Sequence, residues 1–412
     1  MLAHHTAFRH YINYLQLPWR KTQRKNLIRW AAASLVRQSL PVRRLARTLA
    51  PTPQQARQQD NRLRRFLGNE RLQFDAALGA YLRFLLPRLG PSAYIPVMLD
   101  WTYFGDRAIL TLGVPYHGRS LPLFVTVHER TVERRVYSQT QAEISLWRRV
   151  CWQWPAGATP LLLADRGFDK SRLLEWLLHG TTEKKPHERA PSAPGSHPWL
   201  FLIRSCMQAT VRDQHGKRLQ KRLTVYPGET LCYPHVTYHQ TGEFHAHLVV
   251  TCARDRLGHP STWYLLTNLP TAELSATHRA PALRMPPEET YRDYKQGFIL
   301  SGFGLKGLKR LRRDRLERLL CYVALVCGFL VLVAESEKEV RAAFAQRHFR
   351  LSLISFALDV VRVVPQLLLR LARQACASVR LEPVCRKVET PECSRGLTPW
   401  RWGLGRSTFT TC

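Results

Sequence analysis

Residues 93–100 read AYIPVMLD and residues 159–166 read TPLLLADR, and these two stretches decide how the chain is expected to fold. Each is an apolar run of strand length, closed by Asp100 in the first and by Asp165 in the second. A carboxylate at the end of a buried strand is costly unless it is exposed, paired or bound to a cation. The two aspartates therefore predict two corners of a divalent-metal site.

The segments around Asp100 predict an antiparallel meander. RAILTLGVPY at 107–116 and LPLFVTVHE at 121–129 read as strands that follow 93–100 with only short turns between them. A helix is expected over 140–154, TQAEISLWRRVCWQW, before the strand that carries Asp165. The order predicts an α/β fold in which strands one and four both end on an acid.

The segments after Asp165 are predicted to form another helix and further strands. Asp169 is expected to act as N-cap of a helix over 170–178, because aspartate is favoured at that position. A linker rich in Pro and Ser follows at 181–198, and WLFLIRS at 199–205 reads as a fifth strand. Further strand-like runs follow: LTVYP at 223–227, HVTYH at 235–239, FHAHLVVT at 244–251 and WYLLTNL at 263–269.

The chain of 412 residues is long enough for two or three domains with real cores. The expected division is a helical region at 1–90, an α/β core in two parts at 91–206 and 271–340, a β-rich insertion at 207–270, and a basic region at 341–412 whose end has a composition typical of disorder. Residues 39–67, SLPVRRLARTLAPTPQQARQQDNRLRRFL, could form a helix-turn-helix reader of DNA. The alternative is a solvated basic helix bundle that only packs on its neighbour.

The net charge of the chain limits which kinds of binding partner are expected. The chain carries 62 Lys and Arg against 30 Asp and Glu, a formal charge of +32. Such a surface attracts polyanions, of which nucleic acid is the commonest, although a membrane surface or an acidic protein would also fit. Ten cysteines without a CxxC pair fit a reducing cytosol, and the polar N-terminus does not resemble a signal peptide. The apolar run at 319–334 is short for a bilayer span and is predicted to be a buried core helix, so no membrane association is expected.

A third acid for the metal site is expected in RMPPEETYRDYK, residues 284–295. Cleavage of a phosphodiester is well served by two Mg²⁺ ions about 3.5–4 Å apart, and three carboxylates suffice to hold them. Lys295 lies seven residues after Glu288, so the two are only about 20° apart around a helix, whereas Glu289 falls on another face. If Lys295 grips a phosphate beside the metals, Glu288 is the ligand.

The motifs DWTYF (100–104), VPYHGRSLPLFVTVHE (114–129), LLLADRGFD (161–169), WYLLTNL (263–269) and RMPPEETYRDYK (284–295) resemble those of bacterial insertion-sequence transposases. The branch is the DDE class with a Tyr-Arg-Glu-Lys signature, and the resemblance covers about residues 91–335. It implies a ribonuclease-H-like mixed sheet flanked by helices, with a β-strand insertion and an N-terminal helical DNA-binding region.

The resemblance also implies the site. Asp100, Asp165 and Glu288 would hold two Mg²⁺ ions, for which Mn²⁺ can substitute, while Arg284 and Lys295 would contact the DNA backbone and Trp263 would stack on a flipped base. The partners would be double-stranded DNA, namely the inverted repeats of the element and the target, and a second copy of the chain in a DNA-bridged homodimer. The location would be the bacterial cytoplasm, at the nucleoid. No nucleotide cofactor is expected, because the chain has no Walker-type phosphate loop.

Two departures from the family signature are visible. The signature tyrosine should fall at position 281, where this chain has Pro281, and Pro286 with Pro287 separates Arg284 from Glu288. Proline is tolerated in a first helical turn but not in a helix interior, so Arg284 is expected on the lead-in to the helix. The alternatives are a structure-selective nuclease on the same core and a decayed copy that binds DNA without cleaving it.

Overall fold

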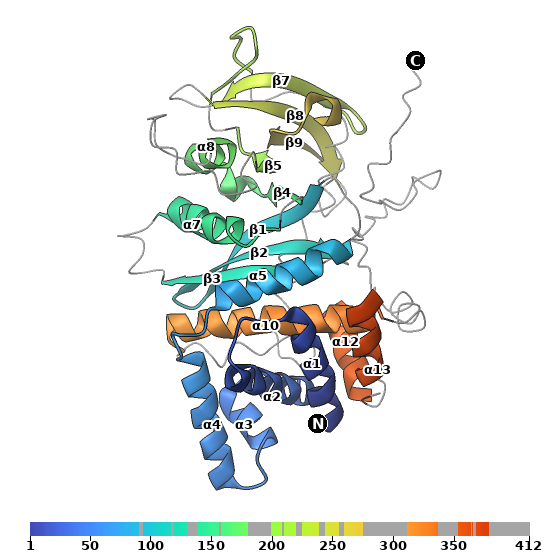
Figure 1. The fold of residues 1–412 in the computed structure, drawn as a ribbon. Coiled ribbons are helices and arrows are strands. Elements are labelled where there is room, and N and C mark those ends of the chain that lie inside the picture. Colours follow the sequence, from blue (N-terminus) through green and yellow to red (C-terminus); the bar gives the residue numbers. More distant parts are fainter. Residues whose placement is uncertain are drawn as a thin grey trace.

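The computed structural model describes most of the chain. Its described residues are 1–89, 94–116, 119–129, 138–155, 158–179, 199–207, 210–219, 225–238, 244–254, 259–274, 311–336, 353–363, 365 and 368–378. Within them the protein is a mixed α/β structure, in which helices flank one large mixed sheet (Figure 1).

The sheet has nine strands among the described residues, in the order β3-β2-β1-β4-β5-β9-β8-β7-β6. They are β1 (Tyr94–Phe104), β2 (Arg107–Tyr116), β3 (Arg119–Glu129), β4 (Thr159–Ala164), β5 (Leu200–Ser205), β6 (Val211–Arg212), β7 (Thr230–Tyr238), β8 (Phe244–Arg254) and β9 (Pro260–Thr267).

The predicted meander is confirmed, since β1 pairs antiparallel with β2 and β2 antiparallel with β3. The β1–β2 turn is tight because Gly105 adopts φ 64, a left-handed conformation that glycine accepts without strain. On the other side of β1, β4 and then β5 are added in parallel. The fifth predicted strand is therefore also confirmed.

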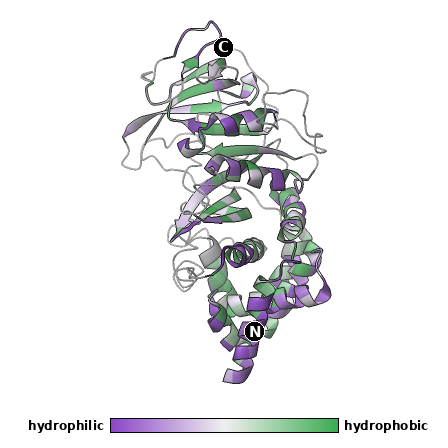
Figure 2. Cartoon of the chain, turned by 90° about the vertical axis from the view of Figure 1, so that its left-hand side faces the viewer, coloured by the Kyte–Doolittle hydropathy of each residue, from purple (hydrophilic) through white to green (hydrophobic). Residues whose placement is uncertain are grey.

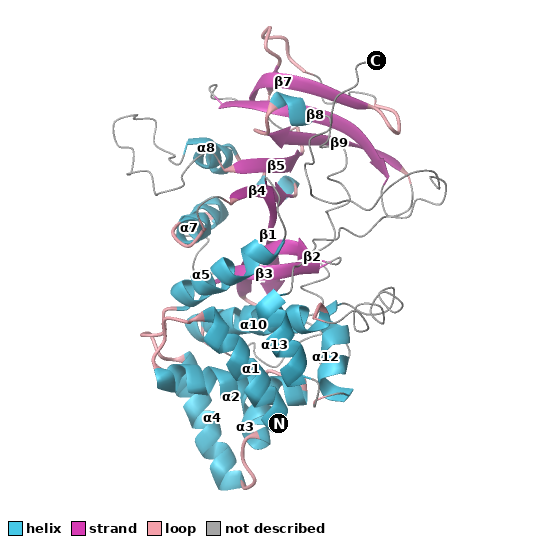
Figure 3. Cartoon of the chain, turned by 45° about the vertical axis from the view of Figure 1, so that its right-hand side comes forward, coloured by secondary structure: helices cyan, strands magenta, loops and turns pink. Residues whose placement is uncertain are grey.

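The strands of the 207–270 region continue the same sheet. β9 pairs antiparallel with β5, and β8, β7 and β6 follow outward (Figure 3). One predicted strand in this region is wrong at the residues described, because residues 225–227 of LTVYP lie in a loop and turn. The β-rich region is thus joined to the core by main-chain hydrogen bonds between β5 and β9.

Two helices cover one face of the central strands. α7 (Gln139–Cys151) confirms the predicted helix, and α8 (Ser171–His179) follows β4 after a short 3₁₀ turn, η2 (Arg166–Phe168). Their apolar residues, including Trp147 and Trp176, belong to the large hydrophobic core. A second, smaller core lies on the opposite face, where Met98, Leu161, Leu163, Leu200, Leu202 and Trp263 are buried together.

A helical body packs beneath β3 (Figure 1). It contains α1 (Leu2–Leu15), α2 (Lys21–Arg37), α3 (Val42–Thr48), α4 (Pro53–Leu67), α5 (Phe74–Leu85) with the turn η1 (Leu86–Leu89), α10 (Arg313–Ala334), α12 (Leu353–Val363) and α13 (Leu368–Ser378). The helical prediction for residues 1–90 is confirmed over the described residues 1–89, where α3 begins after Pro41 and α4 begins at Pro53.

Helix α10 is the centre of this body. It is long and apolar enough to cross a membrane by length and composition, but 89% of its most apolar window is buried inside the protein. In Figure 2 the helices of the body carry green, hydrophobic stretches beside purple, hydrophilic ones. At Gly328 the ring of Tyr81 from α5 comes so close that a Cβ atom would lie 2.5 Å from it. The predicted buried core helix is therefore confirmed.

The described part of the C-terminal region forms two helices, α12 and α13. α12 and α13 pack against α10, and α13 also packs against α1. The Nε2 atom of His4 in α1 lies 3.1 Å from the carbonyl oxygen of Val361 in α12. Part of the basic 341–412 region therefore completes the N-terminal helical body, while its end lies outside the described residues.

Candidate active site

The register of β1 and β4 aligns the residues that lead up to the two predicted aspartates. The parallel pairing runs from Tyr94 beside Thr159 to Met98 beside Leu163, so each residue lies beside the one 65 positions later. Asp100 and Asp165 are separated by the same 65 positions (165 − 100), two residues beyond the last pair. Neighbouring strands lie about 4.8 Å apart, so a register continued by two residues would put the two aspartates side by side.

The prediction that Asp100 closes its strand is wrong. β1 continues to Phe104, because residues 99–104 still pair with β2. The pairing of β1 with β4 nevertheless stops at Met98, and Asp165 directly follows the end of β4 at Ala164, as predicted. Asp100 therefore lies within β1, two residues past Met98, the last residue of β1 that pairs with β4.

Both aspartates belong to one face of the sheet. Side chains alternate along a strand, so Asp100 shares a face with Met98, and Asp165 shares a face with Leu163. Met98 and Leu163 are both in the smaller core, opposite α7 and α8. The carboxylates thus lie at the end of an apolar layer.

Arg204 is a site residue that the sequence analysis did not single out. It lies on β5, its Nη1 is 3.9 Å from Oδ1 of Asp165, and its guanidinium carbon is 4.2 Å from the ring centroid of Trp263. The side chain of Asp165 is 48% exposed, whereas Trp263 as a whole is only 7% exposed. The arginine therefore connects β9, through Trp263, to the aspartate that follows β4, and a base could stack on this side of the ring only by displacing it.

The remaining predicted site residues cannot be placed. Glu288, Arg284 and Lys295 lie outside the described residues, as do Pro281, Pro286 and Pro287. Within the part of the chain that is described, no group of three or more His, Cys, Asp or Glu side chains could hold a metal ion. The described portion of the site is thus a pair of aspartates with a neighbouring arginine.

A buried carboxylate lies on the opposite face of the sheet. Glu143 of α7 is fully buried, and its Oε1 accepts hydrogen bonds from Nε1 of Trp101 and from Nζ of Lys170, each at 2.7 Å. Burial raises the pKa of Glu143, while Lys170 and Trp101 oppose this effect. The sequence held a signal for this residue, because Glu143 is four and seven positions before Trp147 and Val150 on the buried stripe of α7.

Asp169 does not cap α8, so that prediction is wrong. Its carboxylate instead accepts hydrogen bonds from Oγ of Ser205 at 2.7 Å, from the backbone N–H of Cys206 at 3.1 Å and from the hydroxyl of Tyr238 at 2.5 Å. Burial and the charge of Asp169 together raise the pKa of Tyr238 well above its ordinary value. The segment after Asp165 is thus fastened to β5 and to β7.

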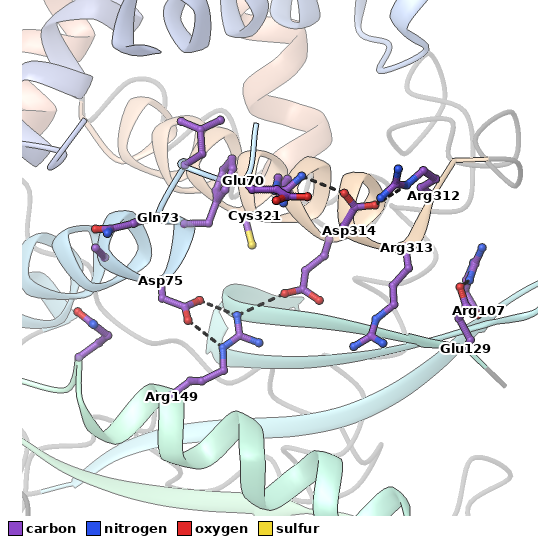
Figure 4. Close-up of a pocket in the computed structure, with 16 residues that line it drawn as sticks. Glu70, Gln73, Asp75, Arg107, Glu129, Arg149, Arg312, Arg313, Asp314 and Cys321 are labelled. Atoms are coloured by element: carbon purple, nitrogen blue, oxygen red, sulfur yellow. Dashed lines mark hydrogen bonds and ion pairs between the residues drawn. The ribbon is translucent and has the colours of Figure 1, made fainter. Parts of the chain in front are cut away.

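A separate cavity of about 900 Å³ lies where α5, α7 and α10 meet β3 (Figure 4). Arg149 crosses it, bonded to Asp75 at 2.5 Å and lying 3.4 Å from Glu317, and Arg318 pairs with Asp314 at 3.1 Å. Its charged lining is balanced, with acids Glu70, Asp75, Glu129, Asp314 and Glu317 and bases Arg107, Arg149, Arg312, Arg313 and Arg318. Among the predicted site residues that the structure describes, Asp100, Asp165 and Trp263 do not line it, and its ion pairs join the helical body to the sheet.

The predicted helix-turn-helix segment contains two helices. α3 ends at Thr48 and α4 begins at Pro53, so four residues connect them. The hydroxyl of Thr52 caps α4 by accepting from the backbone N–H of Gln55 at 3.3 Å. One face of α4 is buried through Leu63, Phe66 and Leu67, while its exposed residues include Gln54, Arg57, Gln58, Asn61, Arg62 and Arg65. The exposed face thus carries side chains that can read base edges and contact phosphates.

A scan against protein-family models and a search of curated proteins found no match for this chain.

Proposed function

We propose that this protein is a DNA transposase of the DDE class, which cleaves the ends of an insertion sequence and joins the 3′-OH to target DNA. The observation that carries the proposal is the register of β1 with β4, which, continued two residues past Met98 and Leu163, would set Asp100 beside Asp165 on one face of the sheet. Two acids at that spacing are what a phosphodiester-cleaving metal site needs. The motifs quoted above add the resemblance to the family.

The arrangement of the first five strands supports a ribonuclease-H-like identity for the core. An antiparallel meander of three strands is followed by α7, by the parallel strand β4, by α8 and by the parallel strand β5. The resulting order is β3-β2-β1-β4-β5, with Asp100 on the central strand. The remaining strands then constitute the β-rich insertion of the proposed family.

The donor set fits hard divalent cations. Both aspartates offer carboxylate oxygens, the ligands that Mg²⁺ prefers, and the half-exposed side chain of Asp165 leaves it accessible from solvent. Asp100, Asp165 and Glu288 would hold two Mg²⁺ ions, with Mn²⁺ as a substitute. When bound, the ions would stabilise charge on the attacking and leaving oxygens of the phosphodiester.

The chain's own residues would position the DNA. Arg204 puts a cation beside Asp165, where a phosphate would approach. Arg284 and Lys295 would add backbone contacts, and Trp263 would stack on a flipped base once Arg204 has moved off its ring. Neither a nucleotide cofactor nor a membrane is part of this proposal.

End recognition is proposed for the α3–α4 segment. The exposed Arg, Gln and Asn side chains of α4 suit the major groove of double-stranded DNA, and the formal charge of +32 would supply salt-dependent affinity for the backbone. A homodimer bridged by DNA would let each protomer act on one end. Such a protein would work in the bacterial cytoplasm, at the nucleoid.

The test is a cleavage and joining assay with the purified protein, Mg²⁺ and DNA that carries the flanking inverted repeats. We expect nicks at the repeat ends and joining of pre-cut ends. Asp100→Asn and Asp165→Asn should abolish both steps but keep end binding, whereas Asp106→Asn, an exposed acid in the β1–β2 turn, should leave them unchanged. Loss of activity in Glu288→Gln but not in Glu289→Gln would identify the third acid.

Each contrary outcome identifies a different alternative. Cleavage of structured DNA without any joining would indicate a nuclease, and specific binding without cleavage would indicate a decayed copy. Cleavage that survives Asp100→Asn together with Asp165→Asn would exclude the proposed site.

A further inference from the structure

Glu143 has an unusual position for a charged residue. It lies in α7 on the face of the sheet opposite the aspartate pair, and its exposed fraction is 0%. Neighbouring members of its stripe, such as Trp147 and Val150, are equally buried and apolar. A carboxylate there loses its hydration, and an apolar residue would ordinarily stabilise such a stripe better.

Both partners of Glu143 come from the segments that carry the aspartates. Trp101 directly follows Asp100 on β1 and, by strand alternation, points to the opposite face. Lys170 follows Asp165 by five residues and lies between the η2 turn and α8. One oxygen, Oε1, accepts from both donors at 2.7 Å, so a single atom holds the two segments at a fixed separation.

The second carboxylate oxygen of Glu143 also indicates that this residue does more than stabilise the fold. Oε2 of Glu143 is buried and has no hydrogen-bond partner among the described residues. A carboxylate kept only to stabilise the fold would be expected to have both oxygens satisfied. The bonding is instead concentrated on the atom that bridges Trp101 and Lys170.

The η2 turn transmits this contact to Asp165. The backbone N–H of Phe168 donates to the carbonyl of Asp165 at 2.9 Å, and that of Lys170 donates to the carbonyl of Phe168 at 2.8 Å. A shift of Lys170 would therefore move a short hydrogen-bonded turn that begins at Asp165. On β1, a shift of Trp101 would move the adjacent Asp100 directly.

We propose that Glu143 is a positioning residue, which sets the separation of Asp100 and Asp165 from behind the sheet through Trp101 and Lys170. This inference rests on the proposed function, because the separation matters only if the aspartates hold metal ions. Contacts that orient metal ligands in this way typically change metal affinity by about 10- to 100-fold when they are removed.

The test measures Mn²⁺ binding to the full chain by the electron paramagnetic resonance signal of free Mn²⁺, without any DNA cleavage. Glu143→Gln keeps the shape of the side chain but removes its charge, and we expect Mn²⁺ affinity to fall by about tenfold or more. Glu175→Gln in the neighbouring helix α8 is the matched control and should bind Mn²⁺ as the wild type does. Affinity for end DNA should be the same in all three proteins.

A second variant guards against loss of folding. Trp101→Phe removes one of the two donors while keeping an aromatic ring against His128, and it should weaken Mn²⁺ binding in the same direction but by less. In a cleavage assay, raising the Mn²⁺ concentration should restore part of the rate in both variants. A lower melting temperature with unchanged Mn²⁺ affinity would overturn the inference, because it would leave Glu143 a purely structural role.

Failure of the proposed function would look different. If the wild type and Asp165→Asn bound Mn²⁺ equally weakly, the aspartate pair would not be a metal site. The positioning role of Glu143 would then be excluded as well. If the wild type bound Mn²⁺ tightly and Glu143→Gln did the same, only the role of Glu143 would be excluded.

Discussion

The guanidinium carbon of Arg204 lies over Trp263, 4.2 Å from the ring centroid, and Nη1 of the same side chain lies 3.9 Å from Oδ1 of Asp165. An arginine held on an aromatic face is restricted in its movement and loses little further entropy when it meets an anion. The contact explains how β9, far along the sequence, influences the end of β4.

Replacing Arg204 should therefore impair cleavage. We expect Arg204→Lys to lower the cleavage rate by about tenfold, equivalent to about 1.4 kcal/mol of transition-state stabilisation, because an ammonium cannot stack and fork as a guanidinium does. The rate is measured on end DNA at saturating Mg²⁺, with Arg212→Lys on the outer strand β6 as the control. Equal cleavage rates in Arg204→Lys and Arg212→Lys would show that Arg204 does not contribute to cleavage.

Trp263→Ala should lower the free energy of unfolding by about 3–5 kcal/mol, because the ring is buried in the smaller core. The base-stacking role implied by the resemblance predicts an additional effect: an abasic nucleotide near the cleavage point should restore part of the lost cleavage rate. Urea unfolding and cleavage of the modified DNA separate the two. A destabilised variant without any such rescue would leave Trp263 as the support of Arg204 alone.

The sequence predicted the architecture well where the information is local. Alternation and apolar runs placed β1 to β5, α7 and the buried helix α10, and the spacing of Asp100 from Asp165 matches the strand register. The predictions from sequence were wrong where contacts between residues far apart in the chain determine the local structure. β1 extends past Asp100 because β2 pairs with it, and Asp169 is drawn from its expected cap by Tyr238, 69 residues away.

Arg204 and Glu143 were missed for the same reason. Their neighbours Trp263, Trp101 and Lys170 come from other elements, and a single sequence gives no direct measure of such contacts. Composition likewise could not show that α12 and α13 pack onto α1, since amphipathic helices near a basic tail can pack on many surfaces.

Salt dependence should report the DNA-binding face of α4. The affinity for end DNA should fall steeply with salt, and Arg62→Ala should reduce the slope of log affinity against log salt by about one unit, because one phosphate contact is lost. Arg373→Ala, an exposed arginine on α13, is the control and should leave the slope unchanged. An affinity insensitive to salt would remove nucleic acid as the partner.

The helical body should weaken in mild acid because of His4. Burial lowers the pKa of His4 below its ordinary value of 6.5, and the nearby positive N-terminus lowers it further, against the opposing effect of the hydrogen bond with Val361. Between the folded pKa and 6.5 the unfolded chain binds more protons, so stability is complete above pH 6.5 and is lost as the pH falls through the folded value.

Urea unfolding at pH 7.5 and 5.5 tests this expectation. His4→Gln should show a smaller loss of stability between the two values than the wild type, whereas replacing the exposed His215 in the same way should not change the loss. A wild-type loss equal to that of His4→Gln would mean that other groups cause the acid sensitivity.

The packing of α13 against α1 also determines when α1 can complete its packing during synthesis. The first helix leaves the ribosome early, yet Phe8 and Tyr11 find their full surroundings only after α10 and the C-terminal helices have been made. Such distant pairing slows folding, since a loop of several hundred residues must close before the contact forms. A growing chain that lacks α13 would thus expose the apolar face of α1, and the proposed DNA-binding helices would complete their packing only when nearly all of the proposed catalytic region has been made.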